Sequence, residues 1–311
     1  MSFNSSFSSD GWCFLIPRLR NESSSTYYSV TLAACVITAF LAPITVVANG
    51  VVLAAIWMNP SLRTPSYVLL AGLAATDFCT GLLSQPFSVI YKLAEMARNR
   101  KLYCIAGLVT ESAALYFSSL TVIVITMIAV ERWLHMSRRS VLTVRRVIVL
   151  YITFGVLPIL GVAARMYSLY YQDKIFRSVI TFYSLAAALC VLLTAFAYFK
   201  VFQIIRRHQN QVQPNENAIT MKKYQKSVIT ILYILAIFVL SYAPYLCIFF
   251  VFHFSSQNDD KTAAALNACA AVVFSSSLFN PLLYYWRMKE IRDGVKSVIR
   301  KLFCKQSDEE S

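Results

Sequence analysis

The chain alternates between long apolar stretches and short clusters of charged residues. Seven stretches are almost free of Asp, Glu, Lys and Arg: Ser23–Leu62, Thr64–Tyr91, Leu102–Val130, Val147–Ala164, Ser178–Phe199, Ser227–Asn258 and Thr262–Trp286. Each reaches the roughly 17–25 residues that a helix needs to cross about 30 Å of hydrocarbon. The pattern therefore predicts seven transmembrane segments.

The pattern within the stretches favours helices over a β-barrel. Backbone groups in lipid must bond internally, which helices and closed barrels achieve. Barrel strands alternate apolar and polar positions in pieces of about 10 residues, and these stretches do not. We predict an all-α membrane protein with a seven-helix bundle at 28–286. An N-terminal tail at 1–27 precedes it, and an amphipathic surface helix at 287–303 and a short tail at 304–311 follow it.

Composition excludes a soluble protein. The chain is 58% hydrophobic and 14% charged, whereas soluble domains are about a quarter charged. An enzyme is not expected, because no catalytic constellation is present. The three histidines, His135, His208 and His253, lie on separate segments and do not form a metal or triad site.

The distribution of charge predicts the orientation. If the N-terminus is extracellular, 19 of the 29 basic residues lie in segments that face the cytoplasm. Cytoplasmic loops carry an excess of Lys and Arg, so this orientation is favoured. The glycosylation sequons at Asn4 and Asn21 lie in the same N-terminal tail. The net charge of +14 is then explained by attraction to anionic lipid of the inner leaflet rather than to nucleic acid.

Two acidic residues fall inside the predicted helices, Asp77 in the second and Glu111 in the third. A charge at membrane depth is costly and usually faces the bundle interior, which makes both residues functional candidates. Polar side chains in other helices can join Asp77 in a cavity suited to water or a small cation: Asn49, Thr121, Ser276, Ser277 and Asn280.

The inner end of the third helix carries a candidate switch. Arg132 can pair with the adjacent Glu131, or release it and point between the helices. Pro244 in the sixth helix removes a backbone hydrogen bond and provides a hinge. Tyr198 and Tyr284, near the inner ends of their helices, are candidate partners for Arg132 once it swings.

From about residue 28 to 303 the chain resembles the rhodopsin-like G-protein-coupled receptors. Five motifs occur in the order and the helices of that family: Asn49, Leu73–Asp77, Glu131–Trp133, Phe238–Pro244 and Asn280–Tyr284. The resemblance implies a plasma-membrane receptor that binds an extracellular ligand and activates heterotrimeric G proteins through a swing of helix six. It also implies that Arg132 engages the G protein, that a sodium ion binds near Asp77, and that Tyr242 stands for a ligand-sensing tryptophan.

The chain departs from the usual family pattern in its cysteines and in helix five, and these departures resemble one subgroup of the family. Cys104 takes about the place of the family's disulfide cysteine, but Arg165–Arg177 contains no cysteine. A Cys13–Cys104 bond is possible, and the sequence leaves the connectivity open. The chain lacks the family's usual loop disulfide and the customary proline of helix five. In both respects it is similar to the melanocortin, cannabinoid, lysophospholipid and adenosine receptors. Cys304, after the surface helix, is either a palmitoylation site or a free inner cysteine.

The candidate ligand pocket includes Glu111, Ala114, Tyr242 and Phe274. Phe274 stands where opsins carry the retinal lysine, and Ala114 stands where amine receptors carry an aspartate. Two alternatives to a ligand receptor are a seven-helix light sensor and a small-solute transporter. The first is disfavoured by Phe274, and the second by the lack of inverted repeats or paired broken helices.

Glu111 lies about 32 Å from Arg132 along the third helix, at ~1.5 Å per residue, and so in the outer third of the bundle. Two interpretations remain open. Glu111 binds the cationic group of a ligand that also has an anionic end, such as a zwitterionic lipid or an acidic-tailed peptide, which suits the basic residues around the mouth. Alternatively, it pairs internally with Arg165 or Arg177 and touches no ligand.

Helix six lacks one restraint that many relatives have. Where they carry an acid at the inner end of this helix, the chain has Tyr224. The missing pair with Arg132 is worth about 1 kcal/mol. The sequence therefore predicts high ligand-free signalling.

Overall fold

The computed structural model describes residues 24–137, 142–171, 175–209, 217–254 and 259–309. Its helices are α1 (Ser25–Met58), α2 (Pro65–Cys79), α3 (Gln85–Met96), α4 (Arg100–Met136), α5 (Val144–Tyr171), α6 (Ile175–Gln209), α7 (Asn217–Phe254), α8 (Asp260–Arg287) and α9 (Lys289–Glu309). A short 3₁₀ turn, η2 (Pro60–Leu62), lies between α1 and α2. A π-helical turn, η3 (Thr80–Ser84), joins α2 to α3, so Pro65–Met96 forms one membrane-length helix.

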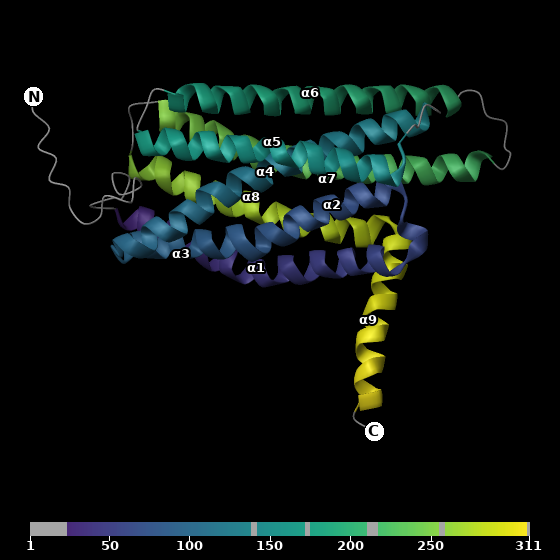
Figure 1. Ribbon diagram of the computed structural model, residues 1–311, viewed down its shortest axis with the longest axis horizontal. Helices are drawn as coiled ribbons and strands as arrows, with labels where there is room; N and C mark the ends of the chain where they lie inside the picture. Colours follow the sequence, from purple (N-terminus) through teal and green to yellow (C-terminus); the bar gives the residue numbers. More distant parts are fainter. Residues whose placement is uncertain (1–23, 138–141, 172–174, 210–216, 255–258, 310–311) are drawn as a thin grey trace, which may run out of the picture.

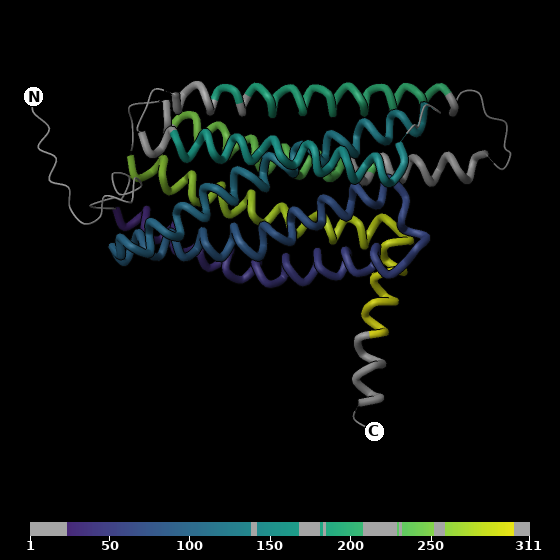
Figure 2. The backbone as a smooth tube through the Cα atoms, viewed as in Figure 1, coloured from purple at the N-terminus to yellow at the C-terminus, as the bar shows by residue number. Residues whose placement is uncertain are grey.

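Within the described residues, seven helices are long and apolar enough to cross a membrane, and they lie along a common axis (Figures 1 and 2). Large apolar side chains point outward from them, including Leu240 (73% exposed) and Phe40 (69% exposed). Such a surface suits lipid and not water. The predicted all-α seven-helix membrane bundle is confirmed.

The two ends of the bundle differ. The helix α1 begins at one end, and α9 leaves the other end and runs crosswise to the bundle helices, away from them (Figure 1). We call these the outer end and the inner end, following the orientation expected from the charges. At the inner end, α9 packs against α1 so closely that a Cβ on Gly294 would lie 3.0 Å from Nδ2 of Asn59. The surface helix runs six residues beyond the predicted 287–303.

The π-helical turn η3 has a local cause. Pro86 follows at the start of α3, and in a regular helix its ring would clash with a carbonyl of the preceding turn. The backbone widens instead, and the N–H of Gln85 bonds to the carbonyl of Thr80. The widened turn packs on α1, where a Cβ on Gly81 would lie 3.1 Å from Cγ2 of Thr45.

The main apolar core lies in the inner half, around α4. Its buried members include Val124 and Ile128 of α4, Val201 of α6, Ile234 of α7 and Tyr284 of α8. Several helices extend past the apolar stretches from which they were predicted; α7 begins at Asn217, ten residues before Ser227. These turns carry polar side chains, so hydropathy alone does not reveal them.

Candidate ligand pocket and coupling site

The predicted switch pair is formed at the inner end of α4. Nε of Arg132 lies 3.5 Å from Oε2 of Glu131, and Ser66 of α2 donates a hydrogen bond of 2.8 Å to Oε1 of the same carboxylate. Glu131 and Arg132 are 2% and 8% exposed. Because both charges are buried, the pair is costly to break by removing one partner. The adjacent carboxylate thus compensates the charge of Arg132, although Nε and Oε2 are not hydrogen-bonded.

The two predicted tyrosines lie in the same inner region. Tyr198 of α6 is close enough to Arg132 for an electrostatic interaction, and Tyr284 of α8 is fully buried. Neither hydroxyl has a hydrogen bond to another described residue. A buried hydroxyl without a partner costs about 1–3 kcal/mol. Both groups would therefore gain by a rearrangement that brings a charged partner to them.

The polar residues predicted to surround Asp77 converge in the middle of the bundle. Nδ2 of Asn280 donates to Oδ2 of Asp77 at 2.7 Å, and Nδ2 of Asn49 donates to the Ser277 carbonyl at 3.1 Å. Asp77 and Asn280 line one cavity together with Thr121, Ser276 and Ser277. Its volume, about 20 Å³, is enough for one water molecule or a small ion.

The same cavity continues outward to three of the four predicted ligand-pocket residues, Ala114, Tyr242 and Phe274. Tyr242 of α7 donates a hydrogen bond of 3.2 Å to Ser118 of α4. Its ring stacks on Phe238, with centroids 4.2 Å apart. The aromatic at this position thus links α4 to the part of α7 that precedes Pro244.

Glu111 does not line this cavity. Nη2 of Arg165, on α5, lies 3.2 Å from Oε2 of Glu111. The Glu111 side chain is 30% exposed, and the Arg165 side chain is 8% exposed. The internal pairing that the sequence left open is therefore formed. Glu111 still faces the interior, since Ser118 lies seven residues further along α4, on the same helix face. The second proposed partner, Arg177, has a side chain outside the described set.

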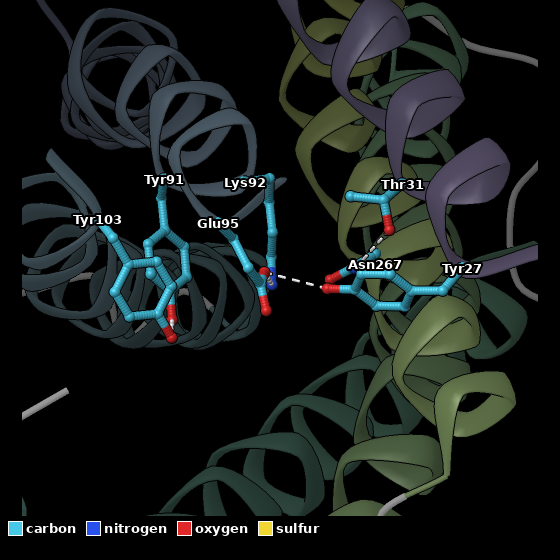
Figure 3. Close-up of polar contacts among 7 residues, drawn as sticks. All are labelled: Tyr27, Thr31, Tyr91, Lys92, Glu95, Tyr103 and Asn267. Atoms are coloured by element: carbon cyan, nitrogen blue, oxygen red, sulfur yellow. Dashed lines mark hydrogen bonds and ion pairs between the residues drawn. The ribbon is translucent and has the colours of Figure 1, made fainter. Parts of the chain in front are cut away.

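Near the outer end, a further group of polar contacts links four helices (Figure 3). The Tyr27 hydroxyl of α1 donates to Oε2 of Glu95 at 3.0 Å, and Lys92 pairs with the same oxygen at 3.1 Å. Asn267 of α8 donates to the Thr31 hydroxyl at 3.0 Å. The adjacent rings of Tyr91 and Tyr103 lie 4.7 Å apart, and their hydroxyls are hydrogen-bonded.

Several expected sites lie outside the described residues: Asn4, Asn21, Cys13 and the side chains of Tyr224 and Cys304. Cys104 is disulfide-bonded. Of the described cysteines, Cys35, Cys79, Cys190, Cys247 and Cys269 are free. The half-cystine that pairs with Cys104 therefore lies outside the described part of the chain.

The sequence did not predict the contacts that three side chains make. Ser66 binds the switch glutamate, and the fully buried Gln85 donates to the Phe274 carbonyl at 3.0 Å. Arg287, the last residue of α8, lies 5.7 Å from the centroid of the Tyr233 ring on α7. A polar amide deep in an apolar stretch is a signal for Gln85. The other two contacts depend on how helices meet, for which one sequence carries no signal.

Comparison with known proteins assigns the class. The sequence model for the family described as "7 transmembrane receptor (rhodopsin family)" matches residues 48–284. The chain therefore belongs to the rhodopsin family of seven-transmembrane receptors. It is a ligand-binding, G-protein-coupled receptor and a multi-pass protein of the plasma membrane.

Individual relatives agree with this assignment. The guinea pig (Cavia porcellus) histamine H2 receptor is 24% identical over 306 residues, covering 90% of this chain and 81% of the relative. The human adenosine receptor A2a is 24% identical over 317 residues, covering 92% and 74%. Squid rhodopsin has the same fold, with a TM-score of 0.75 at 16% identity over 92% of this chain and 89% of that structure.

Proposed function

We propose that the receptor binds a small extracellular ligand in the outer half of the bundle and activates a heterotrimeric G protein through Arg132. The observation that carries this proposal is the buried Glu131–Arg132 pair at the inner end of α4. The Arg132 side chain has two alternative positions. It pairs with Glu131 in one, and in the other it gains the two buried tyrosine hydroxyls as new partners, which is what a switch requires.

The path from ligand to switch runs through Tyr242. The space beside this ring admits about one water molecule, so a ligand that enters it displaces Tyr242 from Ser118. Pro244, two residues further along α7, leaves a backbone hydrogen bond unmade and lets the inner half of the helix swing. That swing opens the space into which Arg132 turns toward Tyr198 and Tyr284. Ligand and G protein then favour the same open state.

The relatives bear on the kind of ligand. Their names identify receptors for histamine and adenosine, both small molecules, and we propose a small molecule here too. Histamine itself is disfavoured, because Ala114 replaces the aspartate that holds the cation in amine receptors. Phe274 likewise offers no amine for retinal.

A sodium ion near Asp77 remains a proposal. The carboxylate is 2% exposed, and among the described residues that line its cavity none is basic. Oxygen atoms of Thr121, Ser276 and Ser277 complete a ligand set that suits a hard cation. A bound cation would compensate the buried charge and stabilise the closed bundle.

We also propose that the N-terminus is extracellular, supported by the charge distribution and the sequons at Asn4 and Asn21. Epitope tags at the two ends, stained before and after permeabilisation, test this. An N-terminal tag visible on intact cells is expected, and a C-terminal tag visible there would reverse the topology. Palmitoylation at Cys304 is the matching proposal for the cytoplasmic side.

The function is tested by a ligand screen on cells that report activation of each G-protein family. The receptor is expected to give a dose-dependent response to at least one small molecule. The Arg132→Ala variant, matched for surface expression, is expected to give none. An unchanged response from this variant would show that Arg132 is not needed for G-protein activation and serves only as a charge at the cytoplasmic end of the helix.

A further inference from the structure

The ion pair between Glu111 and Arg165 occupies an unusual place for a purely structural contact. It joins α4 to α5 in the outer half of the bundle, and the Arg165 side chain is only 8% exposed. Hydrophobic residues of similar volume usually stabilise a buried position as well as an ion pair does. A charged pair here therefore calls for a role beyond packing.

The pair lies directly above the candidate pocket. Glu111, Ala114 and Ser118 are spaced at three and four residues, so they form one inward stripe on α4. Tyr245, one turn outward from Tyr242 on α7, is near enough to Glu111 and Arg165 to interact with both electrostatically. An incoming molecule thus meets the pair first and the aromatic cavity second.

Charge balance selects the kind of molecule that can bind there. A ligand with one charge can replace only one partner of this pair, so the other protein charge loses its 3.2 Å contact without a substitute. A molecule that carries both charges avoids this, because its ammonium group binds Glu111 while its carboxylate binds Arg165. The planar fork of guanidinium N–H groups matches a carboxylate. Both protein charges remain compensated after the exchange.

The cavity below indicates the rest of the molecule. Ala114 contributes only a methyl group, and the walls are the rings of Phe117, Tyr242 and Phe274. These walls favour an aromatic body, which gains from ring contacts as well as from burial. At the outer end, Arg98, Arg100 and Lys101 are exposed and attract an anionic group toward the mouth.

We propose that Glu111 and Arg165 together recognise a small zwitterion with an aromatic body, of the aromatic amino-acid type. This inference rests on the receptor function proposed above and names the chemical class of its ligand. The charge-recognition point is shifted one helical turn outward from position 114. Because the space beside the Tyr242 ring admits only about one water molecule, the aromatic body enters by displacing Tyr242 from Ser118, which connects recognition to the hinge at Pro244.

Three probes that share one body test the proposal: L-phenylalanine, 2-phenylethylamine and 3-phenylpropionate. Their binding is measured calorimetrically on the purified full-length receptor in lipid discs, without G protein. Phenylalanine is expected to bind at least about tenfold more tightly than either single-charge analogue. Equal or tighter binding of an analogue would overturn the proposal, as would no binding of phenylalanine at millimolar concentration.

Variants separate recognition from a structural strut. Glu111→Gln should abolish the preference for phenylalanine over phenylpropionate, and Arg165→Gln the preference over phenylethylamine. The double variant Glu111→Arg with Arg165→Glu restores an ion pair and should restore both preferences. Lys261→Gln, which removes an exposed charge at the outer start of α8 and leaves the rim residues intact, is the matched control. If both preferences persist in the single variants, the Glu111–Arg165 pair is only a structural contact and does not recognise the ligand.

The outcome is independent of coupling. If phenylalanine binds with the expected preference but no G protein responds, the proposed coupling fails and the ligand class stands. If another molecule activates the receptor and the three probes show no preference, the ligand class fails and the coupling stands.

Discussion

Ligand-free signalling should be controlled by the contact between Arg287 and Tyr233. The missing acid at position 224 predicts a weakly restrained helix six, but the structure supplies a different restraint. The guanidinium of Arg287 lies 5.7 Å from the Tyr233 ring centroid and joins the inner part of α7 to the end of α8. An outward swing of α7 must separate these two groups.

The strength of this contact sets the expected effect. A cation over an aromatic ring is worth about 0.5–1 kcal/mol at a partly exposed site, and Tyr233 is 44% exposed. If the contact exists only in the closed state, its loss shifts the closed–open equilibrium by roughly two- to fivefold. Tyr233→Leu should therefore raise basal activity by about that factor when the open state is a small fraction of the receptors.

The assay is ligand-free G-protein activation at matched surface expression. Tyr233→Phe keeps the ring and should behave as the unaltered receptor. Trp286→Leu is the matched control, because the Trp286 ring also lies 5.3 Å from the Arg287 guanidinium but belongs to the same helix as Arg287. Basal activity that is unchanged in Tyr233→Leu, or raised equally in Tyr233→Phe, would show that the contact between Arg287 and the Tyr233 ring does not restrain α7.

Three other predictions follow from the helix contacts. Asp77→Asn should abolish the difference in agonist affinity between sodium and a large organic cation in the buffer; a difference that survives would remove Asp77 from any ion site. Gly72→Val should lower the thermal unfolding temperature by an amount equivalent to about 1–3 kcal/mol, because even a Cβ would lie 2.8 Å from Cε2 of Tyr151; an unchanged temperature would show that the ring simply moves. Peptide mapping without reduction should recover Cys104 linked to Cys13, and a peptide joining Cys104 to any other cysteine would disprove that pairing.

The fold was largely predictable because lipid imposes a simple constraint on sequence. Long uncharged stretches must be helices, so seven of them specify the class of bundle. The convergence of Asp77 with Asn280 was also predictable, since a buried carboxylate needs polar partners and few polar residues occur at that depth. The position of Arg165 beside Glu111 was one of two options that the sequence left open.

What escaped prediction depends on the rotation and proximity of helices. The contact of Arg287 with Tyr233 and that of Ser66 with Glu131 join residues on different helices, and no periodicity in one helix indicates its neighbour's rotation. The π-helical turn before Pro86 shifts the register of the outer part of helix two. That shift changes which side chains face inward, and so it affects Gln85 and the cluster around Glu95.

The proposed function depends on activation of a G protein through Arg132. The most direct test is nucleotide exchange on purified heterotrimeric G proteins by the receptor in lipid discs. We predict faster exchange with at least one G-protein family. This acceleration should be lost in Arg132→Ala and retained in Arg145→Ala, which removes an exposed inner charge. Exchange by Arg132→Ala at the rate of the unaltered receptor, or no acceleration with any family, would contradict the account.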